Sequence, residues 1–266
     1  ELAPLRLDPA GGDLDVPAPG RVDHVGGGEP AGGGLGGGEP DPHGVAALAP
    51  DRRAREARDG LEPGLDIPIG ELGEPEQVVI VSGHLDSWDL GTGAIDDGAG
   101  VAVAMQAAHL IRQLDLRPHR TIRVIAWMNE ENGLMGGKTY DEEHAAEIAN
   151  HFAAIETDGG ADHPLGVYFA GKPELKDFLT PVAKVLQASG AGLLQSREGV
   201  GADIDPLRKR GVPNFSPIQD SRFYFNYHHS AADTLDKIVP RELAENAAIN
   251  AVLAYALANL EQPLPR

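Results

Sequence analysis

The sequence predicts an α/β protein with a mostly parallel, mixed sheet flanked by helices. Two short runs rich in β-branched residues, Gln77 to Ser82 and Thr121 to Trp127, have the composition of buried strands. Between them, apolar residues recur at steps of three and four from Gly98 to about Leu114, as they do on one face of a helix. Strands that alternate with helices in this way form βαβ units, and the strands of such units lie parallel.

The alternation continues to the end of the chain. The next elements we expect are a helix from about Asp141 to Asn150, strands at His151–Glu156 and Gly166–Ala170, helical structure from Pro173 to Ala188, short strands at Gly192–Leu194 and Val212–Phe215, and a helix from Pro240 to about Leu260. Pro181 is expected to break or kink the helix in which it lies, because proline donates no backbone hydrogen bond. The last helix is apolar over a wide face, so it should pack on the sheet.

Residues 1–73 differ in composition from the rest. Three glycine triplets, at 26–28, 32–34 and 36–38, disfavour regular structure. The stretch GLEPGLDIPIG, residues 60–70, does not read as a strand. We therefore expect a poorly ordered Gly/Pro-rich segment, or the remnant of an upstream region, followed by one folded domain over residues 74–266.

Composition and charge exclude several kinds of function. The 266 residues carry a formal net charge of −19, which argues against nucleic-acid binding, since that requires a basic face. There is no cysteine, so disulfides and thiolate metal ligands are excluded. No apolar run is long enough to span a membrane, and no signal peptide is visible.

Ionisable residues stand directly after the predicted strands. His84 and Asp86 follow the first strand, and a glycine-punctuated loop then leads to Asp96 and Asp97 just before a helix. Open α/β sheets carry their sites at the carboxyl ends of the strands. The alternative is that His84 is an ordinary loop histidine and that residues 96–98 form a turn and a helix cap.

Three later segments add residues of the same kind. Glu130 and Glu131 follow the second strand, Asp158 follows the third, and His228 and His229 lie in an aromatic-rich loop near the C-terminus. Each segment alone has an ordinary explanation: an acidic helix start, an Asp-Gly turn, or structural histidines. Together they provide imidazole and carboxylate ligands without sulfur, a set suited to zinc, or to manganese or cobalt. Five ligands with one shared carboxylate would form a two-metal site.

Taken in order, six segments resemble peptidase family M28 of di-zinc exopeptidases, most closely its carboxypeptidase Q-like branch. The segments are SGHLDSWDLGTGAIDDGAG, NEENGLMGGKTY, IETDGG, GADIDPL, GVP and YHHSAADTLD. The resemblance extends over roughly Gln77 to Leu260. It implies the three-layer zinc-exopeptidase fold, also called phosphorylase/hydrolase-like, with two zinc ions per chain for which manganese or cobalt can substitute.

The resemblance also implies a role for each site residue. Glu130 is the general base, Asp86 orients His84, and His228 hydrogen-bonds the substrate carbonyl or the oxyanion. The implied metal ligands are His84, Asp96, Glu131, Asp158 and His229, and Asp96 is the ligand that the two ions share.

The function that follows is hydrolysis of free-ended peptides or dipeptides by a metal-activated water. A secreted or extracytoplasmic location is a further implication of the resemblance. A homodimer is a separate expectation. One alternative is another di-metal amide hydrolase on the same fold. Another is a non-catalytic binding domain, but such domains typically lose metal ligands, and here none is missing.

Overall fold

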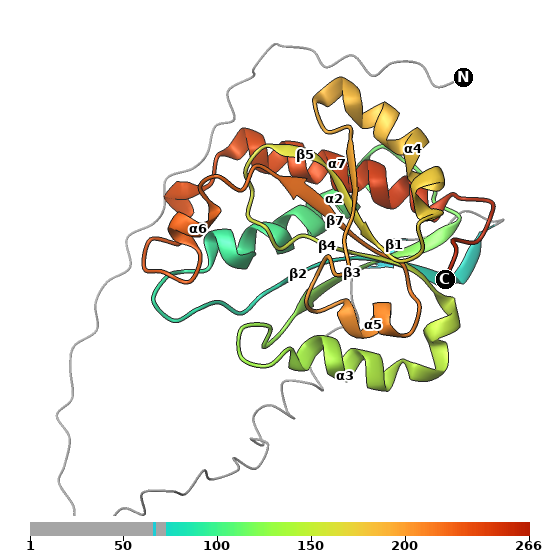
Figure 1. Cartoon of the computed structure of the whole chain (residues 1–266), viewed down its shortest axis with the longest axis horizontal. Coiled ribbons are helices and arrows are strands. Elements are labelled where there is room, and N and C mark those ends of the chain that lie inside the picture. The colour runs from blue at the N-terminus through green and yellow to red at the C-terminus, as the bar shows by residue number, and fades with distance from the viewer. Residues whose placement is uncertain (1–65, 68–72) are drawn as a thin grey trace, which may run out of the picture. The chain divides into compact units, whose positions relative to one another are not determined.

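The computed structural model describes residues 66–67 and 73–266 (Figure 1). The expectation of poor order over residues 1–73 therefore lies almost entirely outside the described residues. Asp66–Ile67 (β1) pairs antiparallel with β3 (Arg120–Trp127), so the expectation of no strand in residues 60–70 was wrong at these two positions. Ile67 precedes a proline, which favours extended backbone, and β1 is an edge strand that needs to pair on one side only.

The sheet has seven strands among the described residues, in the order β1-β3-β2-β4-β7-β5-β6. Its other strands are β2 (Glu74–His84), β4 (His151–Glu156), β5 (Pro164–Ala170), β6 (Leu193–Ser196) and β7 (Asn214–Gln219). The neighbours β3, β2, β4 and β7 are all parallel, whereas β1 and β5 pair antiparallel with β3 and β7. The predicted mixed, mostly parallel sheet is confirmed.

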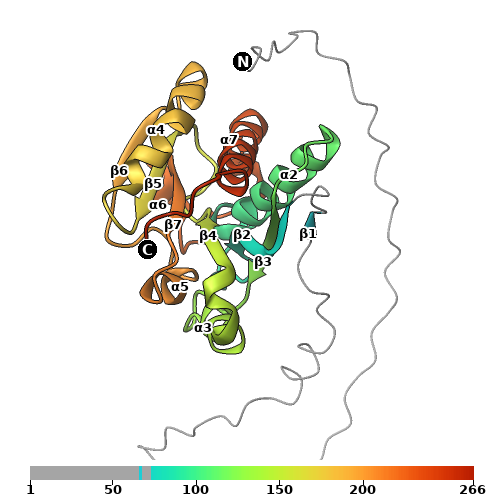
Figure 2. The ribbon, with the colours of Figure 1, turned by 90° about the vertical axis from the view of Figure 1, so that its right-hand side faces the viewer.

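Helices cover both faces of the sheet (Figures 1 and 2). The helices α2 (Ala99–Gln113), α4 (Leu175–Leu186) and α7 (Pro240–Ala258) lie on one side, and α3 (Met135–Glu143) and α5 (Asp205–Lys209) lie on the other. The short elements are η1 (Ala94–Gly98), η2 (Ala145–Asn150), η3 (Gln187–Ser189), η4 (Leu235–Lys237) and α6 (Tyr224–Tyr227). No helix in the described part of the chain is long and apolar enough to cross a membrane.

Strand β2 explains why an unbroken apolar run was needed in the sequence. Side chains alternate between the two faces of a strand, and both faces of β2 are covered by helices. Val79 and Val81 therefore join the hydrophobic cluster that contains residues of α2 and α7, while Val78 and Ile80 join the cluster on the α5 side. This central strand ends at His84, which fixes the position of the first candidate ligand.

Two helix predictions were wrong in detail. The helix expected from Asp141 begins already at Met135, and residues 145–150 form a 3₁₀ helix. Gly136 and Gly137 did not indicate a helix, because glycine is a poor helix former. Gly137 is needed here for packing, since a Cβ atom on it would lie 2.2 Å from the Asp203 carbonyl oxygen. Helix α4 also runs through Pro181 without a break, and Pro181 lies on its exposed face, where water can hydrate the carbonyl left unpaired.

Close packing at the start of α2 leads to a stability prediction. A Cβ atom on Gly100 would lie 2.0 Å from the Thr157 carbonyl oxygen and 2.4 Å from the Asp97 carboxylate. Gly100→Ala should therefore lower the free energy of unfolding by about 1–3 kcal/mol, the usual cost of overpacking, as measured by urea denaturation. Gly199→Ala is the control, because no atom of the described residues lies within 4 Å of its added methyl group. Equal unfolding midpoints for the two variants would contradict the prediction.

Candidate metal centre

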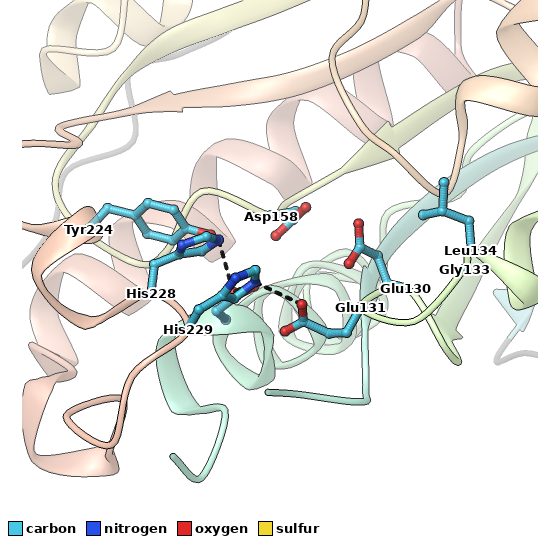
Figure 3. A pocket seen from close by; sticks show the side chains of 9 residues that line it. Glu130, Glu131, Gly133, Leu134, Asp158, Tyr224, His228 and His229 are labelled. Atoms are coloured by element: carbon cyan, nitrogen blue, oxygen red, sulfur yellow. Dashed lines mark ion pairs between the residues drawn. The ribbon is translucent and has the colours of Figure 1, made fainter. Parts of the chain in front are cut away.

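The structure brings the predicted site residues together at one edge of the sheet. The parallel register places His84 beside Trp127 and Ser82 beside Glu156, so β2, β3 and β4 end side by side. The loops after these strands, together with the segment that follows β7, line a pocket of about 390 Å³ (Figure 3). Its lining residues are Asp96, Glu130, Glu131, Gly133, Leu134, Asp158, Tyr224, His228 and His229.

His84 is buried at the base of this arrangement and faces two carboxylates. Its Nδ1 lies 2.9 Å from the main-chain carbonyl oxygen of Asp86, a contact that places the proton on Nδ1. Its Nε2 lies 3.1 Å from Asp96 Oδ1 and 3.4 Å from Asp158 Oδ1. The nitrogen that a cation would use is therefore held next to the oxygens of two other predicted ligands.

Asp86 acts on both the histidine and the acidic pair. Its carboxylate is 3.9 Å from His84 Nδ1, so its closer contact with the ring is through the main chain. The carboxylate instead accepts the backbone N–H groups of Glu130, at 3.0 Å, and Glu131, at 3.3 Å. One loop residue thus connects the end of β2 to the two glutamates that follow β3.

Asp96 lies between His84 and the C-terminal histidines. Its Oδ2 is 3.4 Å from Nε2 of both His228 and His229. Only His229 also approaches Glu131 closely, with Nε2 2.8 Å from Oε2. A carboxylate with one oxygen toward His84 and the other toward His229 has the position that a ligand shared by two ions would occupy.

Unpartnered buried oxygens show that these residues fit a cation. Among the described residues, Asp96 Oδ2 and Glu131 Oε1 are buried and have no hydrogen-bond donor. Buried polar atoms without partners are costly, and carboxylate and imidazole ligands are those that zinc accepts. The ligand atoms of His84, Asp96 and Glu131 lie within 4.8 Å of one another, as do those of Asp96, His228 and His229.

Burial and mutual repulsion shift the pKa values of the acidic groups. Burial, followed by the charge of Asp158, raises the pKa of Glu130 to about 7. Burial also raises the pKa of Glu131 and of Asp158. Burial of His84 opposes its charged form, but hydrogen bonds to Asp158 and Asp96 outweigh this effect and raise its pKa to about 12.

The raised pKa of His84 predicts a pH-dependent metal affinity. Below this pKa the imidazole carries a proton that a metal ion must displace, so zinc binding to the chelator-treated protein at pH 7 should release about one proton from His84. Zinc affinity should then rise with pH, by about tenfold per pH unit for one released proton. Calorimetry in two buffers of different ionisation enthalpy measures this release.

An exposed histidine provides the matched control for that titration. His109 lies on the exposed face of α2, so His109→Gln should release as many protons as the parent protein. Binding heats that are the same in both buffers would contradict the prediction.

Three further residues near the site were not among the predicted site residues. Asp97 accepts the N–H groups of His84 and Gly100, each at 3.0 Å, which is the capping role of the alternative interpretation. Asp203 is fully buried, and neither of its carboxylate oxygens has a hydrogen-bond partner among the described residues. Burial and the charge of Glu130 raise the pKa of Asp203 to about 7. The motif GADIDPL contained this residue but did not reveal its burial.

Trp88 is the third such residue. Its ring stacks on His229, with centroids 4.7 Å apart and an interplanar angle of 14°, and His229 stacks in turn on His228. Trp88 therefore supports one of the candidate ligands from the loop after β2. A tryptophan beside an Asp-Leu turn gave no signal of this contact, because the stacking joins segments far apart in the chain.

Comparison with known proteins finds a matching family and similar curated sequences. The model of peptidase family M28 matches residues 69–254. Carboxypeptidase Q of Xenopus laevis is 43% identical over 192 residues, which cover 72% of this chain and 41% of that protein. Human carboxypeptidase Q is 41% identical over 192 residues, covering 72% and 40%. The chain thus spans about two fifths of the length of these curated relatives.

Solved structures show the same fold. A peptidase M28 precursor from Shewanella amazonensis superposes with a TM-score of 0.69 at 40% identity, covering 76% of this chain and 46% of that one. An aminopeptidase from Aneurinibacillus sp. strain AM-1 superposes with a TM-score of 0.60 at 24% identity, covering 76% of this chain and 48% of that one. The zinc aminopeptidase from Bacillus subtilis superposes with a TM-score of 0.57 at 19% identity, covering 75% of this chain and 52% of that one. The last two likenesses concern the fold alone.

Proposed function

The chain belongs to peptidase family M28, and on that premise we propose that it is a metallo-exopeptidase that hydrolyses free-ended peptides or dipeptides at a centre of two zinc ions. The observation that carries the proposal is the position of Asp96, between His84 and His229 with a buried oxygen that accepts no hydrogen bond. Manganese or cobalt would be accepted by the same ligands.

The proposed centre divides its ligands between two ions. His84 and Asp158 would hold one, Glu131 and His229 would hold the other, and Asp96 would bind both. The interatomic distances support this division, because His84 approaches Asp158 while His229 approaches Glu131. When bound, such ions lower the pKa of a water molecule and polarise a carbonyl group.

Glu130 is the proposed general base. It lines the pocket, and its backbone is held by the Asp86 carboxylate, so its side chain starts from a fixed point (Figure 3). A pKa of about 7 suits a group that must take up and release a proton near neutral pH. Glu130 would accept the proton of water as its oxygen attacks the peptide carbonyl carbon. It would then pass that proton to the leaving nitrogen as the C–N bond breaks.

His228 is the proposed partner of the substrate carbonyl. It lines the same pocket and lies between the rings of His229 and Tyr224, with centroids 3.6 Å and 5.0 Å away. This packing restricts the ring and keeps its Nε2 near Asp96. A hydrogen bond from this nitrogen would stabilise the oxyanion that forms during attack.

The test combines metal analysis with hydrolysis. Elemental analysis should find close to two zinc ions per chain, and the protein should cleave an unblocked dipeptide in a reaction that a chelator stops and added zinc restores. A protein that retains its fold, binds no zinc and cleaves no dipeptide in the presence of zinc would contradict the proposal.

A further inference from the structure

One buried carboxylate joins the loop of Asp96 to the loop of His229. Asp233 is 4% exposed and follows His229 in the same loop. Its Oδ1 accepts the backbone N–H of Ile95 at 2.6 Å, and its Oδ2 accepts the backbone N–H of Asp96 at 3.1 Å. The two carboxylate oxygens of Asp233 thus accept hydrogen bonds from two consecutive residues, and the second of these, Asp96, is a candidate ligand.

The main chain of Asp233 strengthens the same connection. Its carbonyl oxygen accepts the backbone N–H of Thr92 at 2.8 Å and the hydroxyl of Thr92 at 3.1 Å. A Cβ atom on Gly91 would lie 2.9 Å from this oxygen, so the two loops are in direct contact. The segment that carries Asp96 is therefore hydrogen-bonded to Asp233 at three residues, Thr92, Ile95 and Asp96.

The other end of the connection is equally restricted. His229 has a positive φ of 55°, which is unfavourable for a residue other than glycine and persists only where its surroundings hold it. Ser230 donates its backbone N–H to the Tyr227 carbonyl at 3.0 Å and its hydroxyl to the same oxygen at 2.7 Å. Asp233 donates its own N–H to the Ser230 carbonyl oxygen at 3.1 Å, which closes a turn from Ser230 to Asp233 directly after His229.

We propose that Asp233 is a positioning residue that fixes the separation of Asp96 and His229 by holding their two loops together. The proposal rests on the proposed metal centre, in which these two residues share an ion. Asp233 does not face the pocket, and it acts through the backbone of Ile95 and Asp96.

A carboxylate is required at this position because it only accepts hydrogen bonds. Asparagine has the same size but presents one oxygen and one NH₂ group, so it satisfies one backbone N–H and opposes the other. Glutamate keeps both acceptors but is one methylene longer. It can bond both N–H groups only if the loops move apart.

The experiment uses Asp233→Asn, Asp233→Glu and the matched control Asp236→Asn. Asp236 lies in the same segment, is 71% exposed and pairs with Lys237 outside the pocket. Amide hydrogen exchange of Ile95 and Asp96 is measured in chelator-treated protein. The two zinc dissociation constants are then measured by competition with a chromophoric chelator.

Asp233→Asn should speed exchange at the amides of Ile95 and Asp96 by at least tenfold. It should also lower the affinity for the zinc ion held by His229 by about 10- to 100-fold, the usual effect of removing a residue that hydrogen-bonds a metal ligand. Asp233→Glu should keep slow exchange yet still weaken that ion, because the ligands are moved apart. Asp236→Asn should match the parent protein in both measurements.

Two results would overturn the proposal. One is an Asp233→Asn protein with the exchange rates and zinc affinities of the parent. The other is an Asp233→Glu protein that binds both ions as the parent does, which would assign Asp233 to loop stability alone. If the parent protein binds no zinc, the proposed function fails. Amide exchange still tests the connection in that case: faster exchange in Asp233→Asn supports a link between the loops through Asp233, and unchanged exchange contradicts it.

Discussion

Glu130→Gln is expected to lower kcat for dipeptide hydrolysis by roughly 1000-fold while both of the proposed zinc ions remain bound, since loss of a general base typically costs this much. Glutamine has the size of glutamate and keeps the backbone N–H that Asp86 accepts, so the loop after β3 should hold its position. What is lost is the ability to take a proton from water and return it to the leaving amine.

The variant is compared with the parent by steady-state kinetics and elemental analysis. Glu142→Gln is the control, because Glu142 is an exposed glutamate of the neighbouring helix α3. Full activity in Glu130→Gln would show that another group is the base. Loss of one zinc ion would instead make Glu130 a ligand and require a new assignment for Glu131.

Asp96→Asn should have the largest effect on metal binding. The substitution keeps the shape of the side chain but replaces one of two anionic oxygens with an NH₂ group, which cannot bind a cation. Because Asp96 faces His84 with one oxygen and the C-terminal histidines with the other, both proposed ions lose affinity. We expect the weaker ion to be lost and the affinity for the tighter one to fall by more than about 100-fold, beyond the usual cost of an outer-shell change.

Competition with a chelator of known affinity measures this loss, and dipeptide hydrolysis should disappear with it. Asp115→Asn is a suitable control, since Asp115 is 84% exposed and pairs only with Arg117 among the described residues. Retention of two zinc ions in Asp96→Asn, with affinities like those of Asp115→Asn, would exclude a shared carboxylate at this position.

Local patterns predicted the parts of the fold that depend on local sequence. Strand β4 was predicted at its observed bounds, and β3 within one residue, because buried strands need continuous apolar runs. Part of the candidate site was predictable for the same reason, because Glu130, Glu131 and Asp158 follow these two strands within a few residues. The helix start at Met135 was missed because it depends on glycines that fit against Met128 and Asp203, a contact between distant segments.

The choice between the two C-terminal histidines shows the same limit. Their adjacent positions in the sequence do not distinguish them, and only the family resemblance selected His229. In the structure both reach Asp96, but His229 alone also approaches Glu131, and the stacking on Trp88 adds a support that no motif contained. The hydrogen bonds that Asp86 and Asp233 accept from backbone N–H groups of other segments were equally hidden in the sequence.

The strand order has a consequence for the kinetics of folding. The central strand β2 has both its neighbours, β3 and β4, later in the chain, and Ser82 bonds Ile155 across 73 positions. Contacts of this range form slowly, because long loops must close before the contacts contribute. The ligand set is completed only after the segment beyond β7 has docked. A bound cation should therefore slow unfolding while leaving the folding rate almost unchanged, so the protein would gain kinetic stability without folding faster.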